Sequence, residues 1–238
     1  MNVAERLKSN LYRVREQIAD ACYKAGRDPE SVRLVGVTKY LGADLTAELV
    51  RAGLSDIGEN RPQALTEKVE RLSGISVRWH LIGHLQRNKV KLAVRDANLI
   101  HSIDSLPLLI AVNRAAVDMT RTVDVLIEIN ISGDLSKHGL RPEELRTVLE
   151  SARSLENTRI RGLMGMSGLT APQPEKRRQF AVLRELMESH PVYESDGILL
   201  NELSMGMSDD FAEAIAEGST IVRIGSLLFE GLDPLLAN

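Results

Sequence analysis

Short β-branched runs alternate with helical patterns along almost the whole chain of 238 residues, and this alternation limits its fold more than any other feature. Runs of Val, Ile and Leu bounded by turn residues are typical of buried strands. We predict strands at residues 32–37, 55–57, 77–82, 98–101, 123–129, 159–164, 198–203 and 221–224. Helices are predicted between them at residues 43–52, 62–72, 88–94, 106–119, 142–155, 175–190 and 209–217. Strands that each lead into a helix form a parallel sheet.

One more helix is predicted at the start of the chain, at residues 3–25, where apolar residues recur every three or four positions. Gly26 follows it and is expected to end it in the left-handed conformation. Cys22 lies on the apolar face and is predicted to be a small core residue. The last helix is expected to begin with Ser208 as its cap and two acidic residues in its first turn.

The parallel sheet can close into a barrel or stay open with helices on both sides. The glycine-rich dinucleotide fingerprint and the phosphate-loop motif of open sheets are absent from the sequence. No change in composition divides the chain, and α/β barrels reach this length as one unit. We therefore predict that residues 1–238 form a single (β/α)₈ TIM-type barrel domain with an extra N-terminal helix, with the open sheet as the alternative.

Charge and composition exclude several classes of protein. The net charge is −3, so the chain has no basic field for nucleic acid or an anionic membrane. No apolar run reaches the ~18 residues of a membrane span, and the N-terminus lacks the apolar core of a signal peptide. A single cysteine suits a reducing compartment. We expect a cytoplasmic protein and predict no metal site.

In such a barrel the functional groups gather where the strands end, and phosphate often binds after strands 7 and 8. Ser204 follows the seventh predicted strand, and Gly225 and Ser226 follow the eighth. Small residues let the backbone approach an anion, and the hydroxyls can donate hydrogen bonds to it. These loops predict a phosphate site, although tight turns alone would use the same residues.

Lys39 follows the first strand and Arg223 lies in the eighth, so both should reach the same side of the barrel mouth. A lysine there either extends to solvent or is partly desolvated, and desolvation would make its amine a nucleophile towards carbonyls. Pyridoxal 5′-phosphate has an aldehyde and a phosphate, so an amine that can capture the aldehyde beside a phosphate site indicates this cofactor. Arg223 would donate to the pyridine nitrogen, or would form an ordinary rim salt bridge.

Several segments resemble the pyridoxal phosphate homeostasis protein family, whose barrel is related to the N-terminal domain of alanine racemase. They span nearly the whole chain, and the most specific is the serine-methionine-glycine-methionine-serine-aspartate run that begins at Ser204. The matching segments are residues 37–39, 58–60, 79–83, 85–89, 162–164, 203–210 and 222–225. The sequence departs from the family at Tyr40, usually threonine, and at Arg61, commonly tyrosine.

The resemblance implies a barrel of the fold-type III class that holds pyridoxal phosphate on Lys39 as a Schiff base, with Arg223 at the ring nitrogen. It implies that Ser204, Gly225 and Ser226, with the Met205 backbone, hold the phosphate. Asn60 is a further cofactor contact, unless it caps the helix at residues 62–72. No catalytic residue is predicted. His80, within the third strand, is a core group or a catalyst.

The implied function is intracellular pyridoxal phosphate homeostasis, with delivery to apoenzymes that require the cofactor. The alternative is an amino-acid racemase, which needs a second acid–base group opposite the lysine; related racemases take it from a second domain that this chain is expected to lack. Of the tyrosines Tyr12, Tyr23, Tyr40 and Tyr193, only Tyr40 is expected at the mouth. A sugar-phosphate aldolase is a third possibility. We expect a monomer and no enzymatic turnover.

Overall fold

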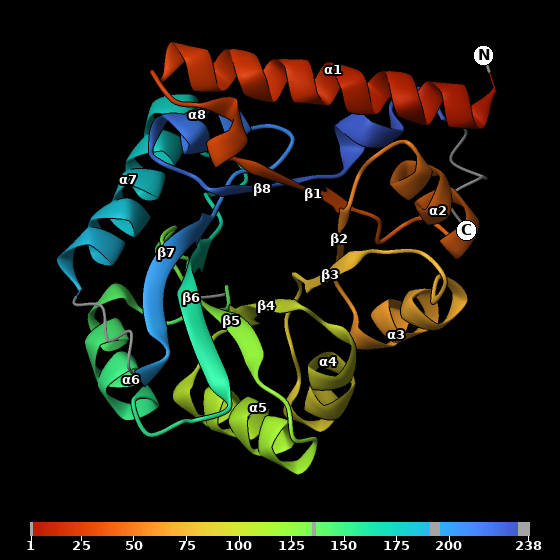
Figure 1. Ribbon diagram of the computed structural model, residues 1–238. Coiled ribbons are helices and arrows are strands. Elements are labelled where there is room, and N and C mark those ends of the chain that lie inside the picture. The colour runs from red at the N-terminus through yellow and green to blue at the C-terminus, as the bar shows by residue number, and fades with distance from the viewer. Residues whose placement is uncertain (1, 135–136, 191–195, 233–238) are drawn as a thin grey trace.

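The computed structural model describes residues 2–134, 137–190 and 196–232 and contains a closed parallel barrel (Figure 1). Its strands are β1 (Arg33–Val37), β2 (Asp56–Glu59), β3 (Arg78–Leu81), β4 (Leu99–Ile103), β5 (Val123–Ile129), β6 (Thr158–Gly165), β7 (Ile198–Ser204) and β8 (Ile221–Ile224). Each strand pairs with the next, and β8 pairs in parallel with β1, so the sheet has no edge. The predicted barrel is confirmed, and the open sheet is excluded.

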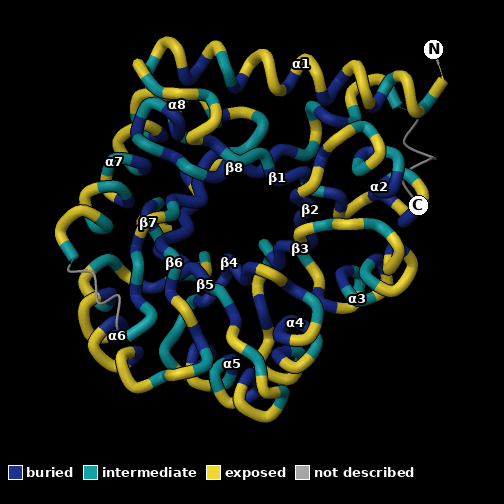
Figure 2. Tube along the Cα trace, viewed as in Figure 1, coloured by how far each residue is buried: buried dark blue, intermediate teal, exposed yellow. Residues whose placement is uncertain are grey.

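Helices surround the barrel, with their buried residues towards the strands and their exposed residues outward (Figure 2). They are α1 (Val3–Lys24), α2 (Ala43–Arg51), α3 (Pro62–Arg71), α4 (Val90–Asp96), α5 (Leu106–Asp118), α6 (Leu145–Ala152), α7 (Gln173–Ser189) and α8 (Phe211–Ala216). Within the described ranges no helix combines the length and the hydropathy that crossing a membrane requires. Tyr193, expected in the connection before β7, lies outside the described residues.

The predicted start of the last helix is wrong by two residues. We expected Ser208 to be the cap, but α8 begins at Phe211. The carboxylate of Asp210 accepts a hydrogen bond from the backbone N–H of Met207 at 2.7 Å and a second one from the hydroxyl of Ser167. Asp210 therefore holds residues 207–210 in a turn, and this turn leaves the side chain of Ser208 at the barrel mouth.

The inside of the barrel changes from apolar to polar towards the C-terminal ends of the strands. A small buried cluster of Val35, Leu99, Leu126, Met164 and Ile221 lies inside the ring of strands. Side chains two positions apart on a strand point to the same face. Glu128, two residues after Leu126, and Arg223, two residues after Ile221, therefore also point inward, nearer the mouth.

Helix α1 supports the segment that follows β8. Asn10 is buried on its inner face and donates hydrogen bonds to the backbone carbonyls of Leu228 at 3.1 Å and Glu230 at 2.9 Å. A buried amide that donates both of its N–H groups fixes the backbone that accepts them. The predictions for this helix are confirmed, because Cys22 is buried and Gly26 has a φ of +66°.

Candidate functional site

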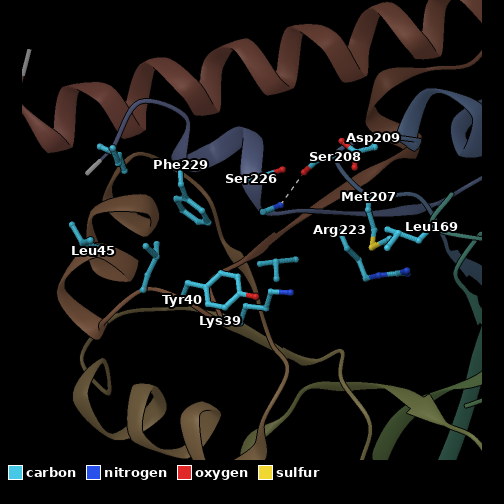
Figure 3. A pocket seen from close by; sticks show the side chains of 14 residues that line it. Lys39, Tyr40, Leu45, Leu169, Met207, Ser208, Asp209, Arg223, Ser226 and Phe229 are labelled. Atoms are coloured by element: carbon cyan, nitrogen blue, oxygen red, sulfur yellow. Dashed lines mark hydrogen bonds between the residues drawn. The ribbon is translucent and has the colours of Figure 1, made fainter. Parts of the chain in front are cut away.

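A pocket of about 480 Å³ opens at the mouth of the barrel beside the C-terminal ends of β1 and β8 (Figure 3). Its apolar wall is formed by Val37, Leu41, Leu45, Leu169, Met207, Phe229 and Leu232. Its polar lining comes from Lys39, Tyr40, Ser208, Asp209, Arg223, Gly225 and Ser226. An apolar cavity of this size with a few convergent polar groups is typical of a site for a small molecule or a cofactor.

The amine of Lys39 lies at the open side of this pocket. Its side chain is exposed, and Nζ lies 4.9 Å from the centre of the Tyr40 ring, a cation–π contact. The structure therefore shows the solvent-reaching alternative for this lysine and not the desolvated one. The amine is accessible to a molecule that enters the pocket.

A buried network fixes the backbone immediately before Lys39. The hydroxyl of Thr38 donates to a carboxylate oxygen of Glu59 at 2.6 Å, and Lys68 donates to the backbone carbonyl of Thr38 at 2.7 Å and forms an ion pair with Glu59. Burial lowers the pKa of Lys68, and the Glu59 carboxylate opposes that shift. Because all three side chains are buried, the network ties the end of β1 to β2 and α3.

Arg223 joins the pocket to the inside of the barrel. It is only 4% exposed, and it donates to the hydroxyl of Ser204 at 2.6 Å and to the backbone carbonyl of Gly165 at 3.1 Å. Burial lowers the pKa of Arg223 to about 10, while the carboxylates of Asp210 and Glu128 act in the opposite direction. The guanidinium therefore stays charged at neutral pH. The hydrogen bonds to Ser204 and Gly165 use two of its five N–H groups.

Below Arg223, four buried side chains form a continuous hydrogen-bonded chain, which we call the buried column: Asp56, His80, His101 and Ser204. His80 Nε2 lies 3.0 Å from a carboxylate oxygen of Asp56, and His80 Nδ1 lies 2.9 Å from His101 Nε2. His101 Nδ1 lies 2.8 Å from the hydroxyl of Ser204, which accepts from Arg223. The column crosses the barrel from β2 through β3 and β4 to β7.

The electrostatics of the column assign its protons. Burial lowers the pKa of His80, and burial together with the charge of Arg223 holds the pKa of His101 well below its usual value, so both rings are neutral. Burial alone would raise the pKa of Asp56, but hydrogen bonds from His80 and Ser55 outweigh it and lower that pKa. Asp56 is thus a carboxylate that accepts from His80 Nε2.

One direction of donation follows from this assignment. His80 Nδ1 has no proton and accepts from His101 Nε2; His101 Nδ1 then accepts from the hydroxyl of Ser204. Ser204 in turn accepts from Arg223. Each neutral imidazole donates once and accepts once, and the negative end of the chain is Asp56. The column therefore holds the guanidinium of Arg223 in place.

Loops after β7 and β8 meet on the other side of Arg223. The backbone N–H of Gly225 points at the hydroxyl of Ser208 over 3.4 Å, a long hydrogen bond drawn as a dashed line in Figure 3. Ser226 opens a 3₁₀ turn, Ser226–Phe229, with an exposed side chain. One backbone N–H and two hydroxyls thus lie together at the pocket wall, on the segment that Asn10 anchors.

Four of the seven predicted cofactor residues line this pocket: Lys39, Arg223, Gly225 and Ser226. Ser204, Met205 and Asn60 are not among its lining residues. Ser204 belongs to the buried column, and the backbone N–H of Met205 donates to the carbonyl of Ile221 at 3.1 Å. Asn60 follows β2. It does not cap α3, because Arg61 occupies the capping position.

Sequence reasoning missed groups that only the folded chain brings together. Ser208 and Asp209 were assigned to a helix start, but both line the pocket. His80 was left open between a core group and a catalyst; it is a satisfied member of the column, and His101 and Asp56 were not singled out. Lys137, at the same end of the barrel, donates to the carbonyl of Ser167 at 3.2 Å and is not a lining residue.

Glu128 lies inside the barrel and is 3% exposed. Burial and the nearby carboxylate of Asp104 raise the pKa of Glu128 to about 7, although Arg223 acts against that rise. This carboxyl therefore changes its charge near neutral pH, close to the guanidinium that faces the pocket. The sequence gives no signal for it, because the shift depends on burial and on neighbours from other strands.

Comparison with known proteins gives consistent matches over the whole barrel. The family model of the alanine racemase N-terminal domain matches residues 6–233. A curated pyridoxal phosphate homeostasis protein from Aquifex aeolicus (strain VF5) is 40% identical over 96% of this chain and 98% of its own length. One from Pseudomonas aeruginosa (strain PAO1) is 37% identical over 95% of this chain and 96% of its own length.

A solved structure has the same fold and carries a ligand. PipY of Synechococcus elongatus PCC7942, solved with PLP bound, superimposes on this chain with a TM-score of 0.79 at 33% sequence identity. The match covers 96% of this chain and 100% of PipY. The similarity therefore extends over both the barrel and the loops that form the pocket.

Proposed function

This chain belongs to the alanine racemase N-terminal domain family, and with its relatives named pyridoxal phosphate homeostasis proteins in view, we propose that it holds pyridoxal 5′-phosphate in the pocket at the barrel mouth. The observation that carries the proposal is the convergence of Lys39, Arg223 and the Gly225–Ser226 segment on one pocket. These groups come from the ends of β1 and β8, which are paired strands.

The donor set fits the chemistry of this cofactor. Pyridoxal phosphate has an aldehyde, a ring nitrogen and a phosphate dianion, and the pocket offers an accessible primary amine, a charged guanidinium and a cluster of N–H and hydroxyl donors. The apolar wall suits the flat face of a pyridine ring. When bound, the cofactor supplies a carbonyl that a lysine amine can capture reversibly.

Each group has a separate proposed role. Lys39 holds the aldehyde covalently as a Schiff base. Arg223 donates to the ring nitrogen, and because its pKa of about 10 keeps it protonated, that nitrogen stays without a proton and the ring withdraws electrons weakly. The hydroxyl of Ser226 and the backbone N–H of Gly225 hold the phosphate.

Ser204, Met205 and Asn60 complete the proposed set of contacts. In the arrangement described above, the hydroxyl proton of Ser204 points to His101. Donation from Ser204 to a phosphate requires the column to reverse: His101 Nδ1 then donates to Ser204, and His80 takes up one proton beside Asp56. Arg33 and Arg78, which face this end of the column, oppose that uptake. We therefore expect the contact of Ser204 to strengthen as the pH falls.

A cofactor carrier fits this pocket better than a racemase. Racemisation needs two acid–base groups on opposite faces of the substrate. In the described part of the chain the titratable residues that line the pocket are Lys39, Tyr40, Asp209 and Arg223. Tyr40 adjoins Lys39, with its ring beneath the amine, and Asp209 is exposed. We propose that the chain protects a reactive aldehyde, releases it to apoenzymes and does not turn over amino acids.

The remaining features of the proposal concern the molecule as a whole. We propose that residues 1–238 act as one domain, that the protein is a monomer, and that it works in the cytoplasm. The single cysteine, which is buried in α1, agrees with a reducing compartment. Light scattering of the purified, cofactor-loaded protein measures the mass directly; a dimer mass would contradict this part of the proposal.

Two assays on the same preparation test the function. The cofactor-loaded protein is incubated with single enantiomers of alanine and other amino acids, and in parallel with an apoenzyme that needs pyridoxal phosphate. We expect no racemisation above background and recovery of the apoenzyme's activity. Lys39→Ala should transfer no covalently held cofactor, and Lys137→Ala should behave as the wild type. Racemisation near ~10 s⁻¹ that disappears in Lys39→Ala would overturn the carrier assignment.

A further inference from the structure

On the side of the barrel mouth formed by β3, β4 and β5, three side chains that can ligate a metal come together. His84 follows β3, Asp104 follows β4 directly, and His138 lies in the connection after β5. One ligand atom from each residue can be chosen so that all three lie within 4.8 Å of one another. The three residues are far apart in sequence, which is why the sequence alone predicts no metal site.

The two imidazoles converge on one carboxylate oxygen. His84 Nδ1 lies 3.1 Å and His138 Nδ1 lies 3.9 Å from Asp104 Oδ2. The two rings stack, with centres 3.9 Å apart and planes within 12°. A hydrogen bond accounts for the shorter contact only, because 3.9 Å is too long for one. The longer contact places His138 Nδ1 near the carboxylate without a hydrogen bond to it.

The distances match those of a transition-metal site. Zinc binds imidazole nitrogen and carboxylate oxygen at about 2.0–2.2 Å, so two ligand atoms in a tetrahedral site lie about 3.3 Å apart. The observed separations of 3.1 and 3.9 Å lie on either side of this value. Because an imidazole nitrogen binds a metal in the plane of its ring, the two exposed rings would rotate out of their stacked arrangement when the ion binds.

The carboxylate of Asp104 is oriented by the side chain of its neighbour, Ser105. The hydroxyl of Ser105 donates to Asp104 Oδ1 at 3.0 Å, which leaves Oδ2 for the imidazoles. A hydrogen bond to the second oxygen of a ligating carboxylate orients it and is a regular feature of metal sites. The carboxylate is only 14% exposed, whereas the rings of His84 and His138 are 40% and 58% exposed, so the cluster is open to an ion from solvent.

We propose that His84, Asp104 and His138 bind one divalent transition-metal ion of the zinc class. Two imidazoles and a carboxylate select zinc, cobalt or nickel over magnesium or calcium, which prefer oxygen ligands. Three protein ligands leave at least one position for water, and that position faces solvent. His84 and Asp104 also line a second pocket of about 570 Å³ with Gln86, Arg87 and Asn88, so the open position adjoins a polar cleft.

This site is separate from the cofactor pocket. No residue lines both pockets. The three ligands follow β3, β4 and β5, whereas the lining residues of the cofactor pocket lie in β1 and β8 or follow β1, β6, β7 and β8. The inference therefore does not depend on the proposed function, and the two can fail independently.

Calorimetric titration of the full chain with zinc chloride, together with metal analysis after dialysis, tests the site. We expect one ion per chain. The zinc affinity should fall by about tenfold or more in each of the variants His84→Ala, Asp104→Asn and His138→Ala. His190→Ala is the matched control, because His190 ends α7 and its Nδ1 lies 2.7 Å from the carbonyl of Leu186. It should bind zinc like the wild type.

Two further measurements distinguish a lost metal ligand from a lost fold and from an effect at the cofactor pocket. His84 and His138 are exposed, and Asp104→Asn keeps the size of the side chain, so circular dichroism should show a folded barrel in each variant. The visible absorption of bound pyridoxal phosphate should stay unchanged when zinc is added, as expected for a separate site. No zinc binding at micromolar concentration, or binding that none of the three substitutions weakens, would overturn the proposal. Zinc that binds only to the cofactor-loaded protein, insensitively to these variants, would also overturn it.

Discussion

Below Arg223 the barrel holds His80, His101 and Ser204 with every ring nitrogen and hydroxyl in a hydrogen bond, whereas the pocket above it presents Lys39 and Ser226 with exposed side chains. The polar groups of the column are used by the fold itself. Those of the pocket are accessible to a ligand. We infer that column residues contribute to stability and orientation, pocket residues contribute to binding, and Arg223 takes part in both.

The largest expected effect is on the pocket side, at Lys39. Lys39→Ala removes the only lysine amine among the described residues that line the pocket, so covalent capture of pyridoxal phosphate should be lost completely. Because the side chain is exposed, the free energy of unfolding should change by less than about 0.5 kcal/mol. Visible absorption and urea denaturation measure the two quantities. Lys137→Ala should keep both at wild-type values; large destabilisation by Lys39→Ala would break the comparison.

A substitution in the buried column should, in contrast, lower the free energy of unfolding. His101→Leu keeps similar volume but leaves His80 and the hydroxyl of Ser204 without a partner in a buried site. Each such loss costs about 1–3 kcal/mol, so we expect about 2–5 kcal/mol of destabilisation. Urea denaturation measures it, with His190→Leu at the end of α7 as the control. A stability equal to the wild type would show that the column is not a structural unit.

Stability should depend on pH in two opposite ways. The folded-state pKa of Glu128, about 7, lies above its ordinary value of 4.5, so the stability that Glu128 contributes is complete below pH 4.5 and is lost as the pH rises to 7. The difference amounts to about 3 kcal/mol. The pKa values of His80 and His101 are lowered, so their contribution is present above pH 6.5 and is lost as the pH falls.

Glu128→Gln separates these two contributions. The variant should be more stable than the wild type at pH 8, by up to about 3 kcal/mol, and similar to it near pH 4. Stability curves measured across this pH range with Glu150→Gln, an exposed position on α6, as control would show the difference. An equal effect of Glu128→Gln at both pH values would contradict the raised pKa.

Two serines test the boundary between column and pocket. Ser226→Ala should weaken cofactor binding by about 1.5–3 kcal/mol without a loss of stability, and unphosphorylated pyridoxal should bind much more weakly than the phosphate form.

Ser204→Ala should lower both binding and stability, because Ser204 bonds to His101 and Arg223. Its share of the binding energy should grow as the pH falls, because uptake of a proton by the column favours donation from Ser204 to the phosphate. Ser154→Ala is the exposed control, and equal affinities for the two ligand forms would show that the phosphate site is misassigned.

The fold could be predicted because its signals are local. The run at residues 221–224 is β-branched and bounded by turn residues, and the observed β8 has the same bounds. Since strand ends of a closed barrel share one face, Lys39 and Arg223 could also be placed together from their positions. The start of α8 could not, because Asp210 accepts from the N–H of Met207 and delays the helix.

The buried column lay beyond sequence reasoning for a different reason. Asp56, His80, His101 and Ser204 sit on four strands, and their contact depends on register and on inward or outward direction at each strand. A shift of one residue in any strand turns its side chain to the other face. The cluster of His84, Asp104 and His138 could not be predicted for a similar reason, since its residues lie in three loops whose shapes no local pattern specifies.

Borohydride reduction of the cofactor-loaded wild-type protein, followed by peptide mapping, tests the central claim most directly. The account predicts a phosphopyridoxyl mass on the peptide that contains Lys39, at one label per chain, with Lys137 unmodified. Stoichiometric label on Lys137, or no label on any peptide, would contradict it.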